Sequence, residues 1–279
     1  MTNIPSVQWV HLQADQRQNF EQPEREQGDS VCKKMLRSIK GIIFDFDGTL
    51  FDHSRIAFHI IADNPIATMR IWKERLIRSG FAGRDFLTSQ NYYRAFFAEL
   101  GKICHLPAER LQAWYFNHYM PRMIRVLKKF YKPRPGLQEL LDRIDSPDSP
   151  IQAAVYSDYP VLKERMEALG LTPLKHIKFY GPDTFGAQKP AVRPYLQIAK
   201  NFGLPPEEVL VVGDREETDG LGAFNAGMRF FCLETGRKRY FRMDPYRSRR
   251  DMPQGPALLM YAGKWEGLTD LLTERLDRK

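Results

Sequence analysis

Two carboxylates stand two positions apart in the segment from Asp45 to Thr49. Residues two apart in an extended chain face the same side, so each of these carboxylates needs a cation or a proton. One division of roles meets both conditions. Asp45 stays ionised as a nucleophile and metal ligand, while Asp47 gives a proton to a leaving oxygen and later takes one from water. Gly48 permits a sharp turn that brings backbone N–H groups close to an anion. The same residues also fit a turn that only closes a strand.

Three other polar positions carry complementary chemistry. Asp214 follows an apolar run, with Glu217 and Asp219 close by, and carboxylates are hard oxygen ligands that suit Mg²⁺. Ser157 can donate a hydrogen bond to a phosphate oxygen, and Lys189, just before a helical pattern, can neutralise a phosphate. Each position also has a structural interpretation, as a helix cap, a turn serine or a solvated lysine. The chemical interpretation therefore depends on a fold that brings these side chains together.

Short apolar runs end at most of these polar positions and predict buried strands. We predict strands over residues 40–46, 151–156, 209–212 and 228–233, and a weaker one over 177–180. Helical patterns lie between the later strands and each ends at a glycine; they cover residues 161–169, 190–202 and 219–226. This alternation predicts an α/β fold, a Rossmann-like parallel sheet core with helices on both faces. Ligands bind at the carboxyl ends of such strands, so we expect one shared site.

The stretch between the first two strands is helical throughout and too long for a single crossover helix. We expect residues 52–132 to form an inserted all-helical cap subdomain. One helix face of this insertion is lined by Ile66, Met69, Trp72 and Leu76. The catalytic core would comprise residues 39–51 and 133–279. Residues 1–38 are rich in glutamine and charge, show no persistent period, and are expected to form a flexible tail.

The composition is that of an ordinary globular protein and excludes several classes. Of 279 residues, 43% are hydrophobic and 27% are charged. No apolar run is long enough to span a membrane, and no secretory signal sequence is visible. The three cysteines lie too far apart for a disulfide framework or a zinc cluster. We therefore expect a cytoplasmic protein with reduced thiols and no membrane association.

The formal net charge of +8 permits an anionic partner such as nucleic acid, a membrane surface or a phosphorylated small molecule. The excess lies in residues 52–132, which hold fourteen basic and six acidic residues. An acid-free run from Arg122 to Arg134 suggests a basic lid that attracts an anionic substrate. Solvated helix faces are the alternative interpretation.

In sequence order, these motifs resemble those of the haloacid dehalogenase-like superfamily. Residues 42–50, ending in Asp45-Phe46-Asp47-Gly48-Thr49-Leu50, match its first motif, and Ser157 matches the second. Lys189 matches the third, and Gly213-Asp214 with Asp219 matches the fourth. The resemblance covers about residues 38–236 and is to the phosphatase branch with a helical type 1 cap, such as phosphoglycolate phosphatases. The insertion stands where that branch has its cap, which closes over the site and contacts the leaving group.

The resemblance implies a role for each matching residue. Asp45 would attack phosphorus in line and form an aspartyl-phosphate, with Asp47 as general acid and then general base. Mg²⁺ would be held by the carboxylates of Asp45 and Asp214 and by the backbone carbonyl of Asp47. Ser157 and Lys189 would bind the phosphoryl oxygens, because phosphoryl transfer depends mainly on positioning and charge neutralisation.

At some positions the sequence departs from the family's motifs or leaves a residue's role undecided. Asp219 would orient metal-bound water or Lys189, but Glu217 competes for that role. Asp158 follows Ser157, where an asparagine is frequent, and a further carboxylate beside a phosphate is unfavourable unless it points away. The basic segment 237–250 has no counterpart in the family.

The expected function is a Mg²⁺-dependent phosphatase that hydrolyses a small phosphorylated metabolite. Dehalogenases of the superfamily lack an acid at the position of Asp47, because a halide leaving group needs no proton. A sugar phosphomutase of the same superfamily is the nearest alternative. A nucleic-acid-binding protein without enzymatic activity is another, although no recognised binding motif is present. The sequence does not indicate an oligomeric state.

Overall fold

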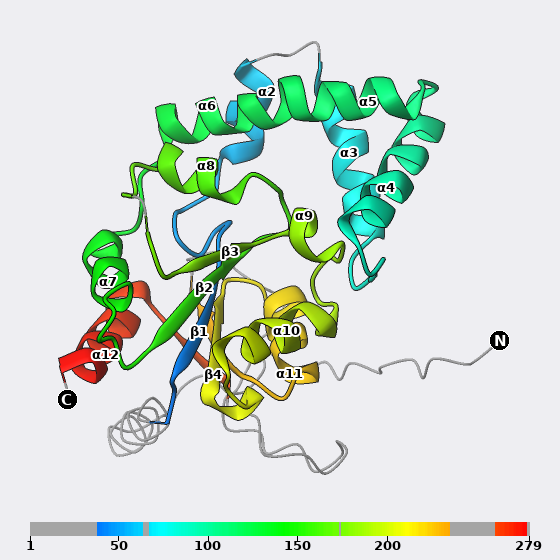
Figure 1. Ribbon diagram of the computed structural model, residues 1–279. Helices are drawn as coiled ribbons and strands as arrows, with labels where there is room; N and C mark the ends of the chain where they lie inside the picture. The colour runs from blue at the N-terminus through cyan, green and yellow to red at the C-terminus, as the bar shows by residue number, and fades with distance from the viewer. Residues whose placement is uncertain (1–37, 64–66, 173, 235–259, 278–279) are drawn as a thin grey trace, which may run out of the picture.

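The computed structural model describes residues 38–63, 67–172, 174–234 and 260–277. In these residues one sheet of six parallel strands has the order β3-β2-β1-β4-β5-β6 (Figure 1). The strands are β1 (Gly41–Asp45), β2 (Gln152–Tyr156), β3 (Lys178–Tyr180), β4 (Val209–Gly213), β5 (Arg229–Leu233) and β6 (Met260–Gly263). The predicted α/β class is confirmed, and β6 is an addition to the predicted strands. Residues 1–37 of the predicted N-terminal tail and the basic segment 237–250 lie outside the described residues.

Strand β1 lies between β2 and β4, and this placement sets the position of the first motif. Its register pairs Asp45 with Tyr156 of β2 and Phe44 with Val212 of β4. Every residue of β1 and of β4 is buried, as expected for a parallel sheet covered on both faces. The carboxyl ends of these three neighbouring strands therefore lie side by side.

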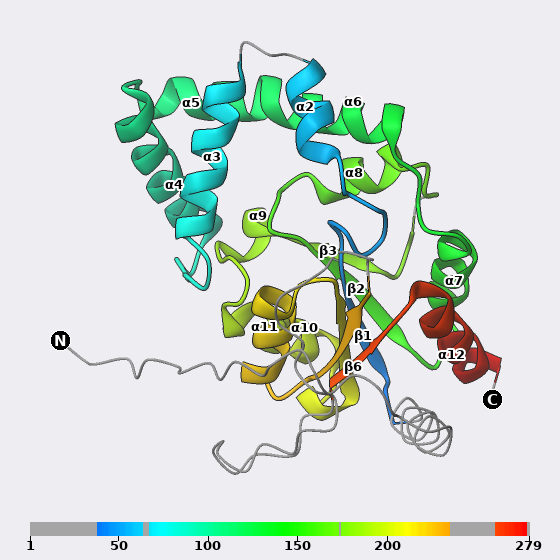
Figure 2. The same cartoon turned by 180° about the vertical axis from the view of Figure 1, so that it is seen from behind.

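Helices cover both faces of the sheet (Figures 1 and 2). The hydrophobic cluster on one face takes in α7 (Leu137–Ile144), α8 (Leu162–Ala168) and α12 (Trp265–Asp277). The cluster on the other face takes in α10 (Val192–Phe202) and α11 (Leu221–Asn225). Short elements complete this part of the chain: α9 (Pro182–Phe185), the 3₁₀ turn η3 (Pro206–Glu208) and the π turn η4 (Glu216–Gly220). None of the helices in the described ranges combines the length and apolar character that crossing a bilayer requires.

A block of helices lies between β1 and β2 in sequence and beyond the carboxyl-terminal edge of the sheet in space (Figures 1 and 2). We call it the helical insert. It consists of α2 (Ile56–Asp63), α3 (Thr68–Gly80), α4 (Ser89–Cys104), α5 (Ala108–Trp114), the π segment η2 (Tyr115–Tyr119) and α6 (Met120–Phe130). The insert is thus placed over the edge at which the polar positions gather.

Helix α3 buries a different face from the one its apolar stripe indicates. Met69, Trp72 and Leu76 are 64%, 60% and 52% exposed. The buried face instead carries Glu74 and Arg78, which form an ion pair. Charges are buried at low cost only when paired and hydrogen-bonded, and Arg78 meets that condition by donating to the hydroxyls of Tyr92 and Tyr115. Hydrophobic periodicity therefore located this helix correctly and oriented it wrongly.

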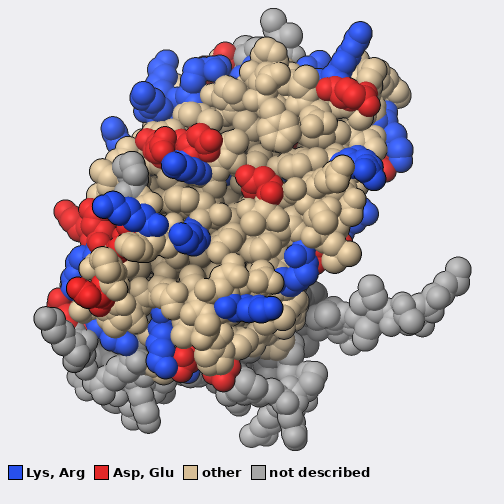
Figure 3. Space-filling model, viewed as in Figure 1, with Lys and Arg blue, Asp and Glu red and all other residues tan. Residues whose placement is uncertain are grey.

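The basic run from Arg122 to Arg134 does not form one surface. Arg122 is buried, and Arg134 donates two hydrogen bonds to the loop after β1. The exposed members on α6 are Arg125, Lys128 and Lys129. Figure 3 shows Lys and Arg side chains along the upper rim of one face, over the helical insert. The lid hypothesis therefore applies only to the exposed part of this run.

Candidate active site

A glycine and an arginine shape the loop that follows β1. Gly48 has φ +96°, in the left-handed region that favours glycine. A Cβ at this position would lie 2.5 Å from Oδ2 of Asp214 and would collide with the ring of His53. The guanidinium of Arg134 donates to the carbonyl of Thr49 at 2.6 Å and to that of Gly48 at 2.8 Å. These contacts hold the loop after β1 close to the carboxylate of Asp214, which follows β4.

Replacing Gly48 with alanine is therefore expected to displace Asp214 and His53 and to lower kcat/KM about 100-fold. Gly170→Ala is the matched control, because Gly170 also has a positive φ of +85° but nothing lies within 4 Å of an added Cβ. That control should lose about 1 kcal/mol of stability and keep its activity. Steady-state kinetics and thermal unfolding of both variants check this, and equal activities in the two would contradict it.

Three carboxylates and one ammonium form a buried cluster at the carboxyl ends of β1 and β4. Oxygen atoms of Asp45, Asp214 and Asp219 all lie within 4.8 Å of one another. Lys189 Nζ lies 2.5 Å from Oδ1 of Asp45 and 2.8 Å from Oδ1 of Asp219. Thr49 Oγ1 donates to the other oxygen of Asp45 at 3.0 Å. Four predicted site residues far apart in the sequence are thus brought together.

The charges of this cluster do not balance. Burial opposes the charged form of Lys189, but Asp219 and Asp45 outweigh it and hold the pKa of Lys189 well above its ordinary value. Burial raises the pKa of Asp219, against the opposing influence of Lys189. Lys189 pairs with Asp45 and Asp219 but not with Asp214, so the group of three carboxylates can take a further cation, and oxygen-only donors suit Mg²⁺. The residues present therefore fit the predicted metal ion.

Asp47 lies in a separate polar group and has its own cation. Arg165 Nη2 donates to Oδ1 of Asp47 at 2.5 Å, and Ser157 Oγ donates to Oδ2 at 3.1 Å. Arg165 Nη1 also donates to Ser157 Oγ at 2.9 Å. Burial raises the pKa of Asp47, but the charge and hydrogen bond of Arg165 outweigh it, so the pKa lies below its ordinary value. The two aspartates of the first motif thus face Lys189 and Arg165 respectively.

Sequence reasoning missed Arg165, although a signal for it exists. Leu162, Met166 and Leu169 are the buried face of the segment that contains α8. Arg165 stands on the same face, where an apolar residue is expected, and it is 0% exposed. An arginine is fully buried only when a charge pairs with it, so its position in the pattern indicates a carboxylate partner.

Arg78 of α3 ties the helical insert to the loop that carries Ser157. Its Nη1 donates to the backbone carbonyl of Asp158 at 2.7 Å, and its Nη2 donates to the hydroxyl of Tyr115 at 2.8 Å. The guanidinium also lies 4.0 Å from the ring centroid of Tyr159. Arg78 is therefore a direct contact between insert and core, which the sequence did not reveal.

The structure shows the contacts of Asp158 and Glu217, the two carboxylates whose roles beside the motifs the sequence leaves undecided. Asp158 Oδ1 accepts a hydrogen bond from the backbone N–H of Lys189 at 2.9 Å, so it holds that loop. Burial raises the pKa of Asp158. Glu217 is paired with Arg215 at 2.9 Å and its side chain is 61% exposed, whereas Asp219 is buried against Lys189. The geometry favours Asp219 over Glu217 as the second acid of the fourth motif.

Comparison with known families agrees with this arrangement. The haloacid dehalogenase-like hydrolase family matches residues 39–227, which is most of the chain. The protein therefore belongs to the haloacid dehalogenase-like hydrolases and is an enzyme of the hydrolase class.

Relatives of known name cover similar shares of the chain. A glyceraldehyde 3-phosphate phosphatase of Pyrococcus furiosus is 26% identical over 213 residues, covering 72% of this chain and 83% of the relative. The protein of the same name from Methanopyrus kandleri is 27% identical over 221 residues, covering 77% and 91%. Among solved structures, the hydrolase YfnB of Bacillus subtilis, described as bound to magnesium, has a TM-score of 0.53 at 16% identity and covers 84% of this chain and 99% of its own. The solved structures support the fold.

Proposed function

We propose that this protein is a Mg²⁺-dependent phosphatase that hydrolyses a small phosphomonoester through an aspartyl-phosphate on Asp45. The observation that carries the proposal is the division between the two aspartates of the first motif. Asp45 lies among Lys189 and the other two carboxylates of the buried cluster, whereas Asp47 is held by Arg165 and Ser157. Two acids two residues apart thereby have different cations and different hydrogen-bond partners, so they can take different roles in one site. The phosphatase names of the relatives agree with this role.

The proposed reaction has two steps. In the first, a carboxylate oxygen of Asp45 forms a bond to phosphorus as the bond from phosphorus to the leaving oxygen breaks, and Asp47 gives that oxygen its proton. In the second, water attacks phosphorus, its proton goes to Asp47, and the bond from phosphorus to Asp45 breaks. Phosphate is released, and both aspartates return to their starting states. Arg165 favours the ionised form of Asp47, which the second step needs, whereas in the first step Asp47 has to carry a proton against the influence of Arg165.

The remaining residues supply positioning and charge. Lys189 and Ser157 would bind phosphoryl oxygens, and Asp219 would orient Lys189, to which it is bonded at 2.8 Å. Mg²⁺, held by Asp45, Asp214 and the carbonyl of Asp47, would offset the charge that builds up on phosphorus oxygens. We further propose that residues 52–132, with the helical insert, form the cap that closes over the substrate, and that the protein acts in the cytoplasm.

Metal removal tests the proposed function. Phosphate release from an aryl phosphate should cease with a chelator and return in full when excess Mg²⁺ is added. Asp214→Asn should raise the Mg²⁺ concentration for half-maximal activity by about tenfold or more, because it removes one charged ligand. Glu217→Gln is the control and should leave that concentration unchanged, since Glu217 lies outside the cluster. Activity that persists in the chelator would contradict the proposal, and isomerisation of a sugar 1-phosphate without phosphate release would favour the phosphomutase.

A further inference from the structure

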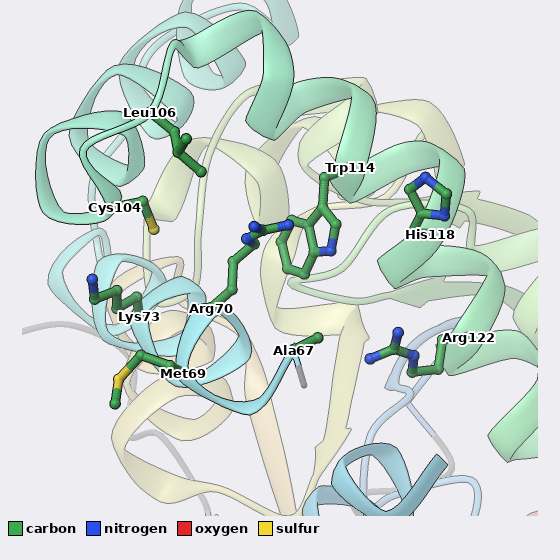
Figure 4. Close-up of a pocket in the computed structure, with 9 residues that line it drawn as sticks. All are labelled: Ala67, Met69, Arg70, Lys73, Cys104, Leu106, Trp114, His118 and Arg122. Atoms are coloured by element: carbon green, nitrogen blue, oxygen red, sulfur yellow. The ribbon is translucent and has the colours of Figure 1, made fainter. Parts of the chain in front are cut away.

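The helical insert contains a second pocket, separate from the candidate active site. Its volume is about 400 Å³, and its walls come from α3, the end of α4 and the continuous stretch α5-η2-α6 (Figure 4). None of the predicted site residues lines it. The polar side chains that do so are Arg70, Lys73, His118 and Arg122. No carboxylate is among the described residues of the lining, so the pocket is electropositive.

Arg122 is the buried charge of this pocket. The residue is 5% exposed, and its Nε and Nη1 have no hydrogen-bond partner among the described residues. The nearest carboxylate is that of Asp63, whose Oδ2 lies 3.5 Å from Nε and is shared with Arg125 at 3.4 Å. Burial lowers the pKa of Arg122, and Asp63 compensates only in part. A buried guanidinium with unmet hydrogen bonds is costly, and an anion beside it would remove that cost.

Two further basic groups of the lining come from a second helix. Arg70 and Lys73 lie on α3, across the pocket from Arg122 (Figure 4). The guanidinium of Arg70 lies 5.1 Å from the ring centroid of Trp114, which fixes its position. Lys73 Nζ donates to the carbonyl of Ile103 at 2.6 Å, and an ammonium has three donors. Two helices thus present donors to one cavity that has an indole in its wall.

We propose that this pocket is a second binding site, which takes a small molecule carrying one or more phosphate groups. Phosphate oxygens would accept from the unmet donors of Arg122 and from Arg70 and Lys73. The size of the pocket suits a small metabolite. The inference goes beyond the proposed function and does not depend on it, because the pocket shares no residue with the catalytic cluster.

Pyrophosphate is a suitable probe, titrated calorimetrically into the full chain in excess chelator. We expect wild type to bind it with a Kd below about 1 mM and Arg122→Gln to bind at least about tenfold more weakly. Arg125→Gln is the matched control, because this substitution removes a positive charge from the same helix and beside the same carboxylate, that of Asp63. Arg125 does not line the pocket. The substitution should change Kd less than about twofold, the effect of a screened surface charge.

Thermal unfolding is the second readout, and it separates a loss of binding from a loss of stability in the Arg122→Gln variant. Pyrophosphate should raise the Tm of wild type and of Arg125→Gln, since a ligand stabilises the state that binds it. It should leave the Tm of Arg122→Gln and of Lys73→Gln almost unchanged. Three results would overturn the proposal. These are no binding by wild type up to about 10 mM, equal weakening by the Arg122 and Arg125 changes, and binding that Lys189→Ala abolishes, which would place the probe in the catalytic cluster.

Discussion

Replacing Asp45 with asparagine should reduce Mg²⁺-dependent phosphate release from p-nitrophenyl phosphate by at least about 1,000-fold. The amide is a poor nucleophile and a weak metal ligand, so both proposed roles of the carboxylate are lost. The fold should persist, because the change removes one negative charge from a buried group of three carboxylates, two of which pair with Lys189. Initial rates and thermal unfolding measured on the same preparation check the two halves of this expectation.

The control is Asp142→Asn, the same chemical change at an exposed aspartate that accepts a hydrogen bond only from Gln138 among the described residues. It should keep the wild-type rate. An Asp45 variant with wild-type turnover would remove Asp45 from the mechanism. A variant that loses activity together with its cooperative unfolding would show a structural role instead.

Replacing Arg165 with methionine should have the largest effect outside the predicted motifs. The change leaves Asp47, whose side chain is 26% exposed, without the fully buried cation that faces it, and breaking this half-buried pair costs about 2 kcal/mol. It should also slow catalysis, since Asp47 and Ser157 both lose the donor that holds them. Chemical denaturation and steady-state kinetics at saturating Mg²⁺ measure these effects.

The matched control is Arg143→Met, which breaks an Arg–Asp pair of the same 2.5 Å length between Arg143 and Asp277. That pair is solvent-exposed and is expected to contribute less than about 1 kcal/mol. Equal losses of stability in the two variants would contradict the importance of burial at Arg165.

The low pKa of Asp47 also predicts a pH dependence of stability. Because its pKa is lower in the folded than in the unfolded protein, Asp47 contributes stability above its ordinary pKa of 3.8. That contribution to stability is lost as the pH falls from 3.8 through the lower pKa that Asp47 has in the folded protein. In Arg165→Met, where the cause of the shift is gone, this part of the acid sensitivity should disappear. Denaturation at pH 7 and near pH 3 compares the two proteins, and an unchanged acid loss in the variant would argue against the pairing.

The fold was largely predictable because its strands are buried on both faces. The runs at β1, β2, β4 and β5 are continuous and apolar, and each ends at a turn. Strand β6 was missed because Met260–Gly263 is short and contains a glycine, which gives no strand period. The orientation of α3 was also missed, since burial of its Glu74–Arg78 pair depends on tyrosine hydroxyls from other helices.

The candidate site was predictable to the extent that strand ends locate it. Asp45 ends β1, and Ser157 and Asp214 follow the two adjacent strands, so topology alone brings them together. The partnership of Arg165 with Asp47 joins residues 118 positions apart and depends on how α8 packs. No local pattern specifies that distance, although an arginine on a buried helix face was a usable sign.

The central claim is that phosphate passes through a covalent bond to Asp45, and chemical trapping tests it most directly. Enzyme mixed with substrate and Mg²⁺ is quenched in acid during the first turnovers and reduced with borohydride, which converts an acyl phosphate on aspartate to homoserine. Peptide mass spectrometry should then find homoserine at position 45, dependent on both substrate and Mg²⁺. Phosphate release without that product, or with the product at a different residue, would contradict the account.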